Sequence, residues 1–333
     1  YKRQLENSIF GAIRILYVSP ERLASEIFQT KMKHMQVSFI TVDEAHCISQ
    51  WGYDFRPSYL KISDIRRIHP SAPILALTAT ATPDVIDDIQ ERLGFAEKRV
   101  FRMSFERKNL AYVVRRTINK QQEMIHILQC VEGCAIVYVR SRKKTKETAE
   151  LLCGNGIDAT YYHAGLDNAT RDERQKAWQS GKIRVMVATN AFGMGIDKPD
   201  VRIVIHRDMP DSIEAYFQEA GRGGRDGKKS YAILLWNKSD IGKINKRIKS
   251  TFPDKDYIKT VYEHLAYFYQ IPTGAGYNLS FEFGLDKFCH IYGHFPLHAD
   301  AALKILDHAG YIEYIEEQDN NCLLYTSPSP RDA

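Results

Sequence analysis

The stretch VSFITVDEAHCISQWGYDFRP, residues 37–57, decides how the rest of the sequence is interpreted. Its apolar run, Val37 to Val42, is typical of a strand buried on both faces, as in a parallel sheet. The run ends in two carboxylates, at the strand end where open α/β sheets bind ligands. We expect Asp43 to hold Mg²⁺ through its oxygens, and Glu44 to orient or deprotonate a water aimed at a γ-phosphate.

An aromatic loop follows these carboxylates directly. Trp51, Tyr53 and Phe55 can stack on unpaired bases while Arg56 meets a phosphate. The alternative is an ordinary strand end with a solvated acidic pair and a partly buried loop. A chance match to Asp-Glu-Ala-His has odds on the order of one in 10⁵ per position at average residue usage. We therefore favour the functional interpretation, which the surrounding structure has to support.

Length and composition allow two or three globular domains. The chain has 333 residues, of which 44% are hydrophobic and 26% charged, ordinary values for a globular protein. No apolar run approaches the ~20 residues that span a bilayer, and no secretory signal opens the sequence, so we expect an intracellular protein without a membrane segment. The net charge of +5 permits nucleic-acid binding through local basic patches without requiring it.

The six cysteines are scattered and include no C-x-x-C pair. Cys130 and Cys134 lie closest together and flank the start of a predicted strand. Buried, reduced thiols are therefore favoured over metal ligands. We expect neither a disulfide framework nor a zinc site in this chain.

The order of strands and helices predicts two doubly wound parallel-sheet domains. For the first, residues 1–103, we expect strands at 13–18, 37–42 and 74–77 and helices at 59–68 and 83–93. A loosened, basic stretch from about Ser104 marks the boundary. For the second, residues 104–240, we expect strands at 135–139, 159–162, 185–188, 201–205 and 231–235 and helices at 121–129, 143–153, 171–179 and 212–220.

A smaller third unit is predicted at residues 254–318. Its expected helices are 257–269, 285–292 and 299–308, and its expected strands are 279–283 and 311–315. This α+β outline fits a winged-helix module, although many small folds share it. Residues 320–333 carry Ser-Pro repeats and no periodicity, so we expect a non-native tail and leave it out of the fold.

Polar residues follow three strands of the second domain. Arg140 and Ser141 follow the first strand, His163 the second and Thr189 the third. Because parallel strands share their C-terminal edge, these side chains should lie side by side, where they suit phosphate contacts along a single nucleic-acid strand. For any one of them a structural role fits equally well.

The segment QEAGRGGRDG, residues 218–227, is the sharpest signal in the second domain. A helix breaks into glycines and presents Arg222 and Arg225 at its end. Glycines let the backbone approach closely, and two guanidiniums can neutralise charge that develops on a transferred phosphoryl group. The alternative is a basic surface turn. The nearby GKKS, residues 227–230, is not a phosphate loop, because the required glycine spacing and preceding strand are missing.

Together, five segments closely resemble the motifs of the RecQ family of superfamily-two DNA helicases: DEAHCISQWGYDFRP, ALTATA, YHAGL, ATNAFGMGIDKPDVR and QEAGRGGRDG. The resemblance covers roughly residues 13–240, and SQWGYDFRP is its most family-specific part. It implies two RecA-like lobes with ATP between them and single-stranded DNA across their tops. It also implies Mg²⁺-dependent ATP hydrolysis that drives 3′-to-5′ unwinding of duplex DNA, in repair or recombination.

The resemblance assigns roles to individual residues. Asp43 would bind Mg²⁺ and Glu44 would activate water. His46, with Thr78 and Thr80, would link the nucleotide to the DNA face. The DNA would be sensed by Trp51, Phe55 and Arg56. Residues of the second lobe would complete the nucleotide site, one arginine acting as the finger: Gly195, Asp197, Gln218, Arg222 and Arg225.

The sequence also departs from the family. Tyr53 stands where the aromatic loop usually has histidine, which leaves that side chain's hydrogen bond in doubt, and Gly223 stands where alanine is common. The four-cysteine zinc subdomain is missing, since only Cys289 and Cys322 follow the second lobe. No phosphate loop precedes Asp43, so we expect the chain to begin inside the first lobe.

Two alternatives therefore stay open. The first is an RNA helicase, against which the aromatic loop argues. The second is a catalytically inactive module that only binds nucleic acid, which would follow if Tyr1 were the true start. The sequence indicates no oligomeric state.

Overall fold

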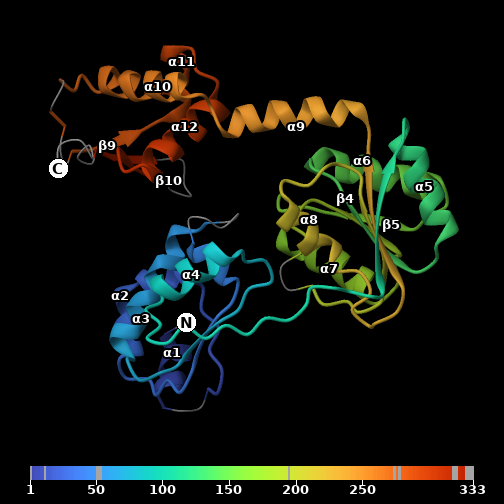
Figure 1. The fold of residues 1–333 in the computed structure, drawn as a ribbon, viewed down its shortest axis with the longest axis horizontal. Helices are drawn as coiled ribbons and strands as arrows, with labels where there is room; N and C mark the ends of the chain where they lie inside the picture. Colours follow the sequence, from blue (N-terminus) through green and yellow to red (C-terminus); the bar gives the residue numbers. More distant parts are fainter. Residues whose placement is uncertain are drawn as a thin grey trace. The chain divides into compact units, whose positions relative to one another are not determined.

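Strands interleaved with helices form the larger part of the molecule, and the arrangement of each part is drawn in Figure 1. The structure, a computed structural model, describes residues 2–10, 13–49, 55–193, 196–272, 275–276, 279–316 and 322–326. It consists of two compact units, Tyr1–Leu235 and Trp236–Ala333. Within the first unit lie two separate sheets, each with its own core.

The larger sheet has six strands in the order β3-β8-β7-β4-β6-β5. The pairs from β8 to β5 are all parallel, as the alternation of strands and helices predicts. In chain order the strands are β3 (Leu110–Arg116), β4 (Cys134–Tyr138), β5 (Ala159–Tyr162), β6 (Val185–Ala188), β7 (Val201–His206) and β8 (Ser230–Trp236). The intervening helices are α5 (Lys120–Cys130), α6 (Arg142–Gly154), α7 (Asn168–Gln179) and α8 (Ile213–Ala220).

Helices cover both faces of this sheet, because side chains of a strand alternate between faces. Ala135 and Val137 of β4 are fully buried against α5 and α6. Ile136 and Tyr138 of the same strand pack on the other side, in a cluster with Trp178 of α7. The doubly wound fold predicted for this region is confirmed.

Most predicted bounds in this region agree with the structure within one residue. Helix α7 begins three residues earlier than predicted, because Asp167 caps it by accepting a hydrogen bond from the backbone N–H of Thr170 at 2.9 Å. Strand β3 was missed. It is one of the two edge strands of this sheet, and its exposed Tyr112, Val114 and arginines conceal the apolar alternation.

The first lobe holds a parallel pair of strands, β1 (Ile40–Val42) and β2 (Ile74–Ala76). Strand β1 is shorter than predicted and is not buried on both faces, since Thr41 is exposed. The strand predicted at 13–18 is absent there, and Ile15 and Tyr17 are 69% and 91% exposed. An apolar run shows which residues favour burial, but a strand also needs a neighbour for its backbone hydrogen bonds.

Four helices build the core of this lobe: α1 (Lys2–Ile9), α2 (Glu26–Met32), α3 (Ser63–Ile68) and α4 (Pro83–Arg92). Helix α4 begins as predicted, with the Thr82 hydroxyl accepting from Val85 N at 3.5 Å, and Gly94, at φ +63°, follows its end. The helix predicted at 59–68 is split, because Pro57 opens a 3₁₀ turn at Pro57–Ile62 before α3.

The second unit contains α9 (Lys238–Thr251), α10 (Lys255–Phe268), α11 (Leu285–Tyr292) and α12 (Pro296–His308). Its antiparallel sheet has the order β10-β11-β9, built from β9 (Ser280–Phe283), β10 (Ile312–Glu316) and β11 (Cys322–Thr326). Helices α10 to α12 and strands β9 and β10 confirm the predicted α+β outline. Helix α9 was missed, because lysines and Gly242 interrupt its apolar pattern; a capping box between Asn237 and Asp240 begins it.

Residues 322–326 differ from the expectation that 320–333 stand outside the fold. They form β11 and pair with both β10 and β9. Five residues are too few to show a period in sequence, whereas two neighbouring strands supply their hydrogen bonds. That residues 320–333 are a non-native tail stays a prediction. Within the described ranges, no helix is both long and apolar enough to cross a membrane.

Candidate functional site

The carboxylate pair lies where β1 ends in a sharp turn beside β2. Leu77 N donates to Val42 O at 2.8 Å, and Ala45 N donates to Leu77 O at 2.9 Å. Glu44 has φ 49° and ψ 42°, a left-handed conformation that costs a residue with a side chain about 1 kcal/mol. Such strain persists where surrounding contacts enforce it, and here it orients the carboxylate at the end of the sheet.

A string of polar contacts links the carboxylates to the end of β2. The ring of His46 is buried, with Nδ1 3.4 Å from Glu44 Oε2 and 3.1 Å from Thr78 Oγ1. Thr78 Oγ1 also accepts from Thr80 N at 3.4 Å. The structure therefore brings together His46, Thr78 and Thr80, to which the resemblance assigns the link to the DNA face, and places His46 beside Glu44.

Asp43 fits the requirements of a Mg²⁺ ligand. Its side chain is exposed, and Oδ1 accepts from Glu44 N at 2.9 Å. No cluster of three or more His, Cys, Asp or Glu able to hold a metal occurs among the described residues. A single protein carboxylate suits Mg²⁺, which keeps several waters and is often held by one or two carboxylates together with substrate phosphates.

The aromatic loop is described only at its end. Trp51 and Tyr53 lie outside the described residues. Phe55 and Arg56 are half-buried, and Arg56 N donates to Cys47 O at 2.8 Å. Arg56 therefore lies against the 3₁₀ turn Ala45–Ile48, which directly follows the carboxylates.

In the second lobe, both arginines of the glycine-rich turn contact the segment around residues 193, 196 and 197. Arg222 is buried, at 8% exposure, and its Nη1 donates to Gly193 O at 2.6 Å. Arg225 is more accessible; its Nη1 lies 2.8 Å from Asp197 Oδ1 and 3.2 Å from Ile196 O. Asp197 therefore contacts Arg225, whereas Gly195 lies outside the described residues.

A hydrogen bond connects α8, the helix that leads into the glycine-rich turn, to a carboxylate of the first lobe. Gln218 Nε2, on α8, donates to Glu44 Oε1 at 3.2 Å across a sequence separation of 174 residues. The next residue, Glu219, is buried and pairs with His206 Nε2 at 2.9 Å. This second contact fixes α8 on the sheet; sequence reasoning missed it, because His206 ends an apolar strand without any motif.

Three predicted DNA contacts do lie at one sheet edge. Tyr138 and Tyr162 both pair with Ala188, so the strand ends before Arg140, His163 and Thr189 are level. Two polar groups there already have protein partners, as Arg140 Nη1 is 2.5 Å from Asp211 and Ser141 Oγ caps α6. Burial, aided by two neighbouring arginines, lowers the pKa of His163.

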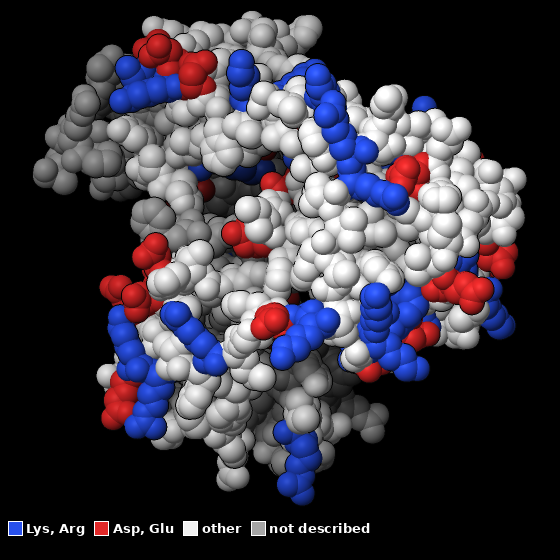
Figure 2. Space-filling model, turned by 45° about the vertical axis from the view of Figure 1, so that its right-hand side comes forward, with Lys and Arg blue, Asp and Glu red and all other residues white. Residues whose placement is uncertain are grey.

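The cysteine and charge patterns agree in part with expectation. The five cysteines whose side chains are described are free thiols, and burial raises the pKa of Cys134 to about 12. Cys130 and Cys153 are exposed rather than buried, since one ends α5 and the other lies in the last turn of α6. On the face drawn in Figure 2, lysines and arginines alternate with carboxylates instead of forming one continuous basic field.

Comparisons with known proteins agree with this geometry. The family profile described as "DEAD/DEAH box helicase" matches residues 1–89, and "Helicase conserved C-terminal domain" matches residues 119–227. Among solved structures, yeast (S. cerevisiae) Dbp5 bound to RNA and ADP BeF3 has a TM-score of 0.51 at 21% identity, over 68% of this chain and 60% of that one. At 21% identity, the likeness to Dbp5 concerns the fold alone.

Curated relatives narrow the assignment. The ATP-dependent DNA helicase RecQ of Pasteurella multocida is 40% identical over 247 residues, 74% of this chain and 39% of that protein. The RecQ of Bacillus subtilis is 43% identical over 233 residues, 69% of this chain and 39% of that protein. The RecQ-like DNA helicase blm-1 of Caenorhabditis elegans is 43% identical over 251 residues, 72% of this chain and 25% of that protein.

The two matched helicase domains, on parallel α/β sheets, place the chain in the class of DEAD/DEAH-type helicases with a RecA-like fold. Within this class, the chain belongs to the RecQ family. It spans 39% of the length of the two bacterial RecQ proteins that it matches.

Proposed function

We propose that this chain is the motor region of an ATP-dependent DNA helicase that moves 3′ to 5′ along single-stranded DNA and unwinds duplex DNA inside the cell, in repair or recombination. The hydrogen bond between Gln218 and Glu44 is the observation that supports it best. It joins the residue expected to activate water to the helix that ends in Arg222 and Arg225. ATP hydrolysis coupled to movement requires groups from both lobes to meet at one nucleotide.

The proposed chemistry divides between the two lobes. Mg²⁺, held through Asp43, would neutralise charge on the β- and γ-phosphates. Glu44 orients the attacking water and takes its proton, while His46 holds the Glu44 carboxylate on one side and Gln218 on the other. Both contacts position the base before the substrate arrives, which reduces the reorganisation required during the reaction.

Of the two arginines, Arg225 is the better candidate for the finger. Its contact with Asp197 is an exposed ion pair, with side-chain exposures of 37% and 83%, and such pairs are worth about 0–1 kcal/mol. A phosphate can therefore displace Asp197 at little cost. Arg222, buried against Gly193, would instead support the wall of the site.

We propose that the DNA strand runs over the sheet edge at Arg140, Ser141, His163 and Thr189 and reaches the aromatic loop at Trp51, Phe55 and Arg56. His46, in the middle of the relay from Glu44 to Thr78, directly precedes Cys47, whose carbonyl accepts from Arg56 N. Closure of the lobes around ATP and their reopening after hydrolysis would then move the strand.

Replacement of Glu44 by glutamine tests the assignment in the full-length protein. The loss of a general base lowers kcat for DNA-stimulated hydrolysis by about 10²- to 10⁴-fold, whereas binding of a fluorescent ATP analogue persists. Glu91→Gln, at an exposed position on α4, is the matched control. Unchanged turnover in Glu44→Gln would refute the proposal.

Two further measurements separate the alternatives. Stimulation of ATP hydrolysis by single-stranded RNA as strongly as by single-stranded DNA would favour an RNA helicase. The 333 residues contain no G-x-x-x-x-G-K-[ST] sequence, so we propose that this chain by itself binds DNA weakly, in a salt-sensitive way, and hydrolyses almost no ATP. Substantial turnover by the purified chain would contradict that statement.

A further inference from the structure

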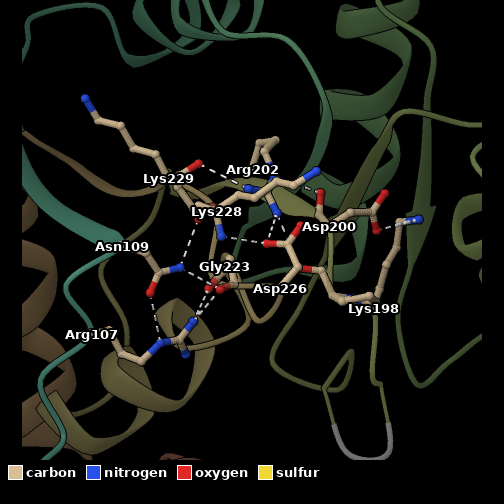
Figure 3. Close-up of polar contacts among 12 residues, drawn as sticks. Arg107, Asn109, Lys198, Asp200, Arg202, Gly223, Asp226, Lys228 and Lys229 are labelled. Atoms are coloured by element: carbon tan, nitrogen blue, oxygen red, sulfur yellow. Dashed lines mark hydrogen bonds and ion pairs between the residues drawn. The ribbon is translucent and has the colours of Figure 1, made fainter.

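The glycine-rich turn is held from outside by two residues that sequence reasoning left without a role. Figure 3 shows Arg107 and Asn109, from the segment before β3, directed at the backbone beside Gly223. Arg107 Nη2 donates to Gly223 O at 2.9 Å and to Gly224 O at 2.7 Å, and its Nη1 donates to Gly221 O at 3.4 Å. One guanidinium therefore binds three carbonyls of a single turn.

Asn109 closes the same turn from its other end. Its Nδ2 donates to Gly224 O at 2.6 Å and to Lys228 O at 2.9 Å, and its backbone carbonyl accepts from Ser230 N at 2.8 Å. Arg107 Nε lies 3.5 Å from Asn109 Oδ1, so the two side chains also support each other. Carbonyls of the turn that follows α8 are therefore bound by side chains from a distant part of the chain.

The backbone at Gly224 leaves no room for a side chain beside Asn109. Its φ is +60°, and a Cβ there would stand 2.6 Å from Asn109 Nδ2 and 2.6 Å from Ser230 Oγ. On the far side of the turn, Arg202 of β7 holds Asp226 at 2.6 Å (Figure 3). The glycines that suggest a flexible helix end in the sequence therefore form a turn fixed on both sides.

We infer that Arg107 and Asn109 are positioning residues, which hold the turn so that the guanidiniums of Arg222 and Arg225 are preorganised for the transferred phosphoryl group. The anchored carbonyls of Gly221 and Gly223 flank Arg222, and Gly224 directly precedes Arg225. A catalytic cation misplaced by about 1 Å can cost on the order of 10²-fold in rate. This inference rests on the proposed function.

Kinetics of the full-length protein test the role. Arg107→Ala should lower kcat for DNA-stimulated ATP hydrolysis by about 10- to 100-fold, with a much smaller change in KM. Arg107→Lys should restore little, because an ammonium is a point charge that cannot reproduce the planar fork. Lys108→Ala is the matched control, since this exposed lysine lies between the two positioning residues.

A double-mutant cycle separates positioning from general destabilisation. If Arg107 acts through Arg225, the variant lacking both side chains should be no slower than Arg225→Ala alone. Losses that multiply would overturn the inference, and so would Arg107→Ala turnover within twofold of Lys108→Ala. If Arg107→Ala does not fold, the turnover of Asn109→Ala and Arg107→Lys is compared with that of Lys108→Ala in the same way.

Hydrogen exchange in the 333-residue chain gives a readout independent of activity. Amides of residues 221–227 should exchange at least about tenfold faster in Arg107→Ala than in Lys108→Ala, because the anchored turn opens locally; equal exchange would overturn the clamp. The proposed function fails separately, if the full-length protein shows no DNA-stimulated hydrolysis or if Glu44→Gln stays active.

Discussion

Replacement of Gly224 by alanine should destabilise the second lobe by about 3 kcal/mol. The left-handed backbone at φ +60° costs alanine about 1 kcal/mol relative to glycine. The new Cβ would also displace the Asn109 amide, which donates two hydrogen bonds at 2.6 and 2.9 Å, and each such bond is worth about 1 kcal/mol. The sum of these terms gives the expected loss.

Gly227 supplies the matched control. It too is left-handed, at φ +79°, but a Cβ there would meet no atom within 4 Å. Gly227→Ala should therefore cost only the backbone term of about 1 kcal/mol. The difference between the two variants, about 2 kcal/mol, isolates the contact with Asn109 from the conformational preference of glycine.

Urea unfolding measures this difference. Because the chain has two compact units and its two lobes have separate cores, the transition to follow is that of the second lobe. Trp178, fully buried beneath its sheet, reports on it by fluorescence when Trp51 and Trp236 are replaced by phenylalanine in every variant. Equal midpoints for Gly224→Ala and Gly227→Ala, at equal denaturant slopes, would refute the reasoning.

Two further predictions concern the same lobe. Burial opposes ionisation of Asp208, but hydrogen bonds from Arg140 N and Lys144 lower its pKa below the usual 3.8. Its stabilisation is therefore present above pH 3.8 and is lost as pH falls through the lowered pKa. Asp208→Asn should thus be less stable than the parent at neutral pH and equally stable in strong acid; a constant gap in urea titrations from pH 2 to 7 would contradict this. Trp178→Phe should lose about 2 kcal/mol, because it opens a cavity and removes the bond from Nε1 to Ala135 O at 3.2 Å. Ile118→Ala, at a fully exposed position, should change the unfolding free energy by less than about 0.5 kcal/mol, and similar losses in both variants would show that burial is not the cause.

Sequence patterns predicted most of the second lobe because β4, β5 and β7 are short apolar runs, each followed by a helix with a capping side chain. They failed at residues 13–18, where the apolar residues are present but no strand among the described residues pairs with them. They also missed β3 and α9, whose charged side chains obscure the period. Local composition shows which residues favour burial, but pairing partners far along the chain decide what becomes buried.

The candidate site, too, was predicted only in part. Motifs located Glu44, His46, Thr78, Gln218 and both arginines. Nothing in the sequence shows that Glu44 adopts a left-handed backbone or that Glu219 pairs with His206. Arg107 was noticed only as part of a basic stretch. Its partners are backbone carbonyls more than a hundred residues away. Because every residue has a backbone carbonyl, the sequence does not indicate which of them bind a side chain.

The exposed apolar side chains of the segment 13–18 have a practical consequence for work with this chain. Ile15, Leu16 and Tyr17 are 69%, 40% and 91% exposed. Apolar, β-prone runs with free backbone groups are templates for pairing with other molecules. In concentrated solution we expect self-association to begin here, and a lysine in place of Ile15 should raise the solubility limit while leaving the second lobe unchanged.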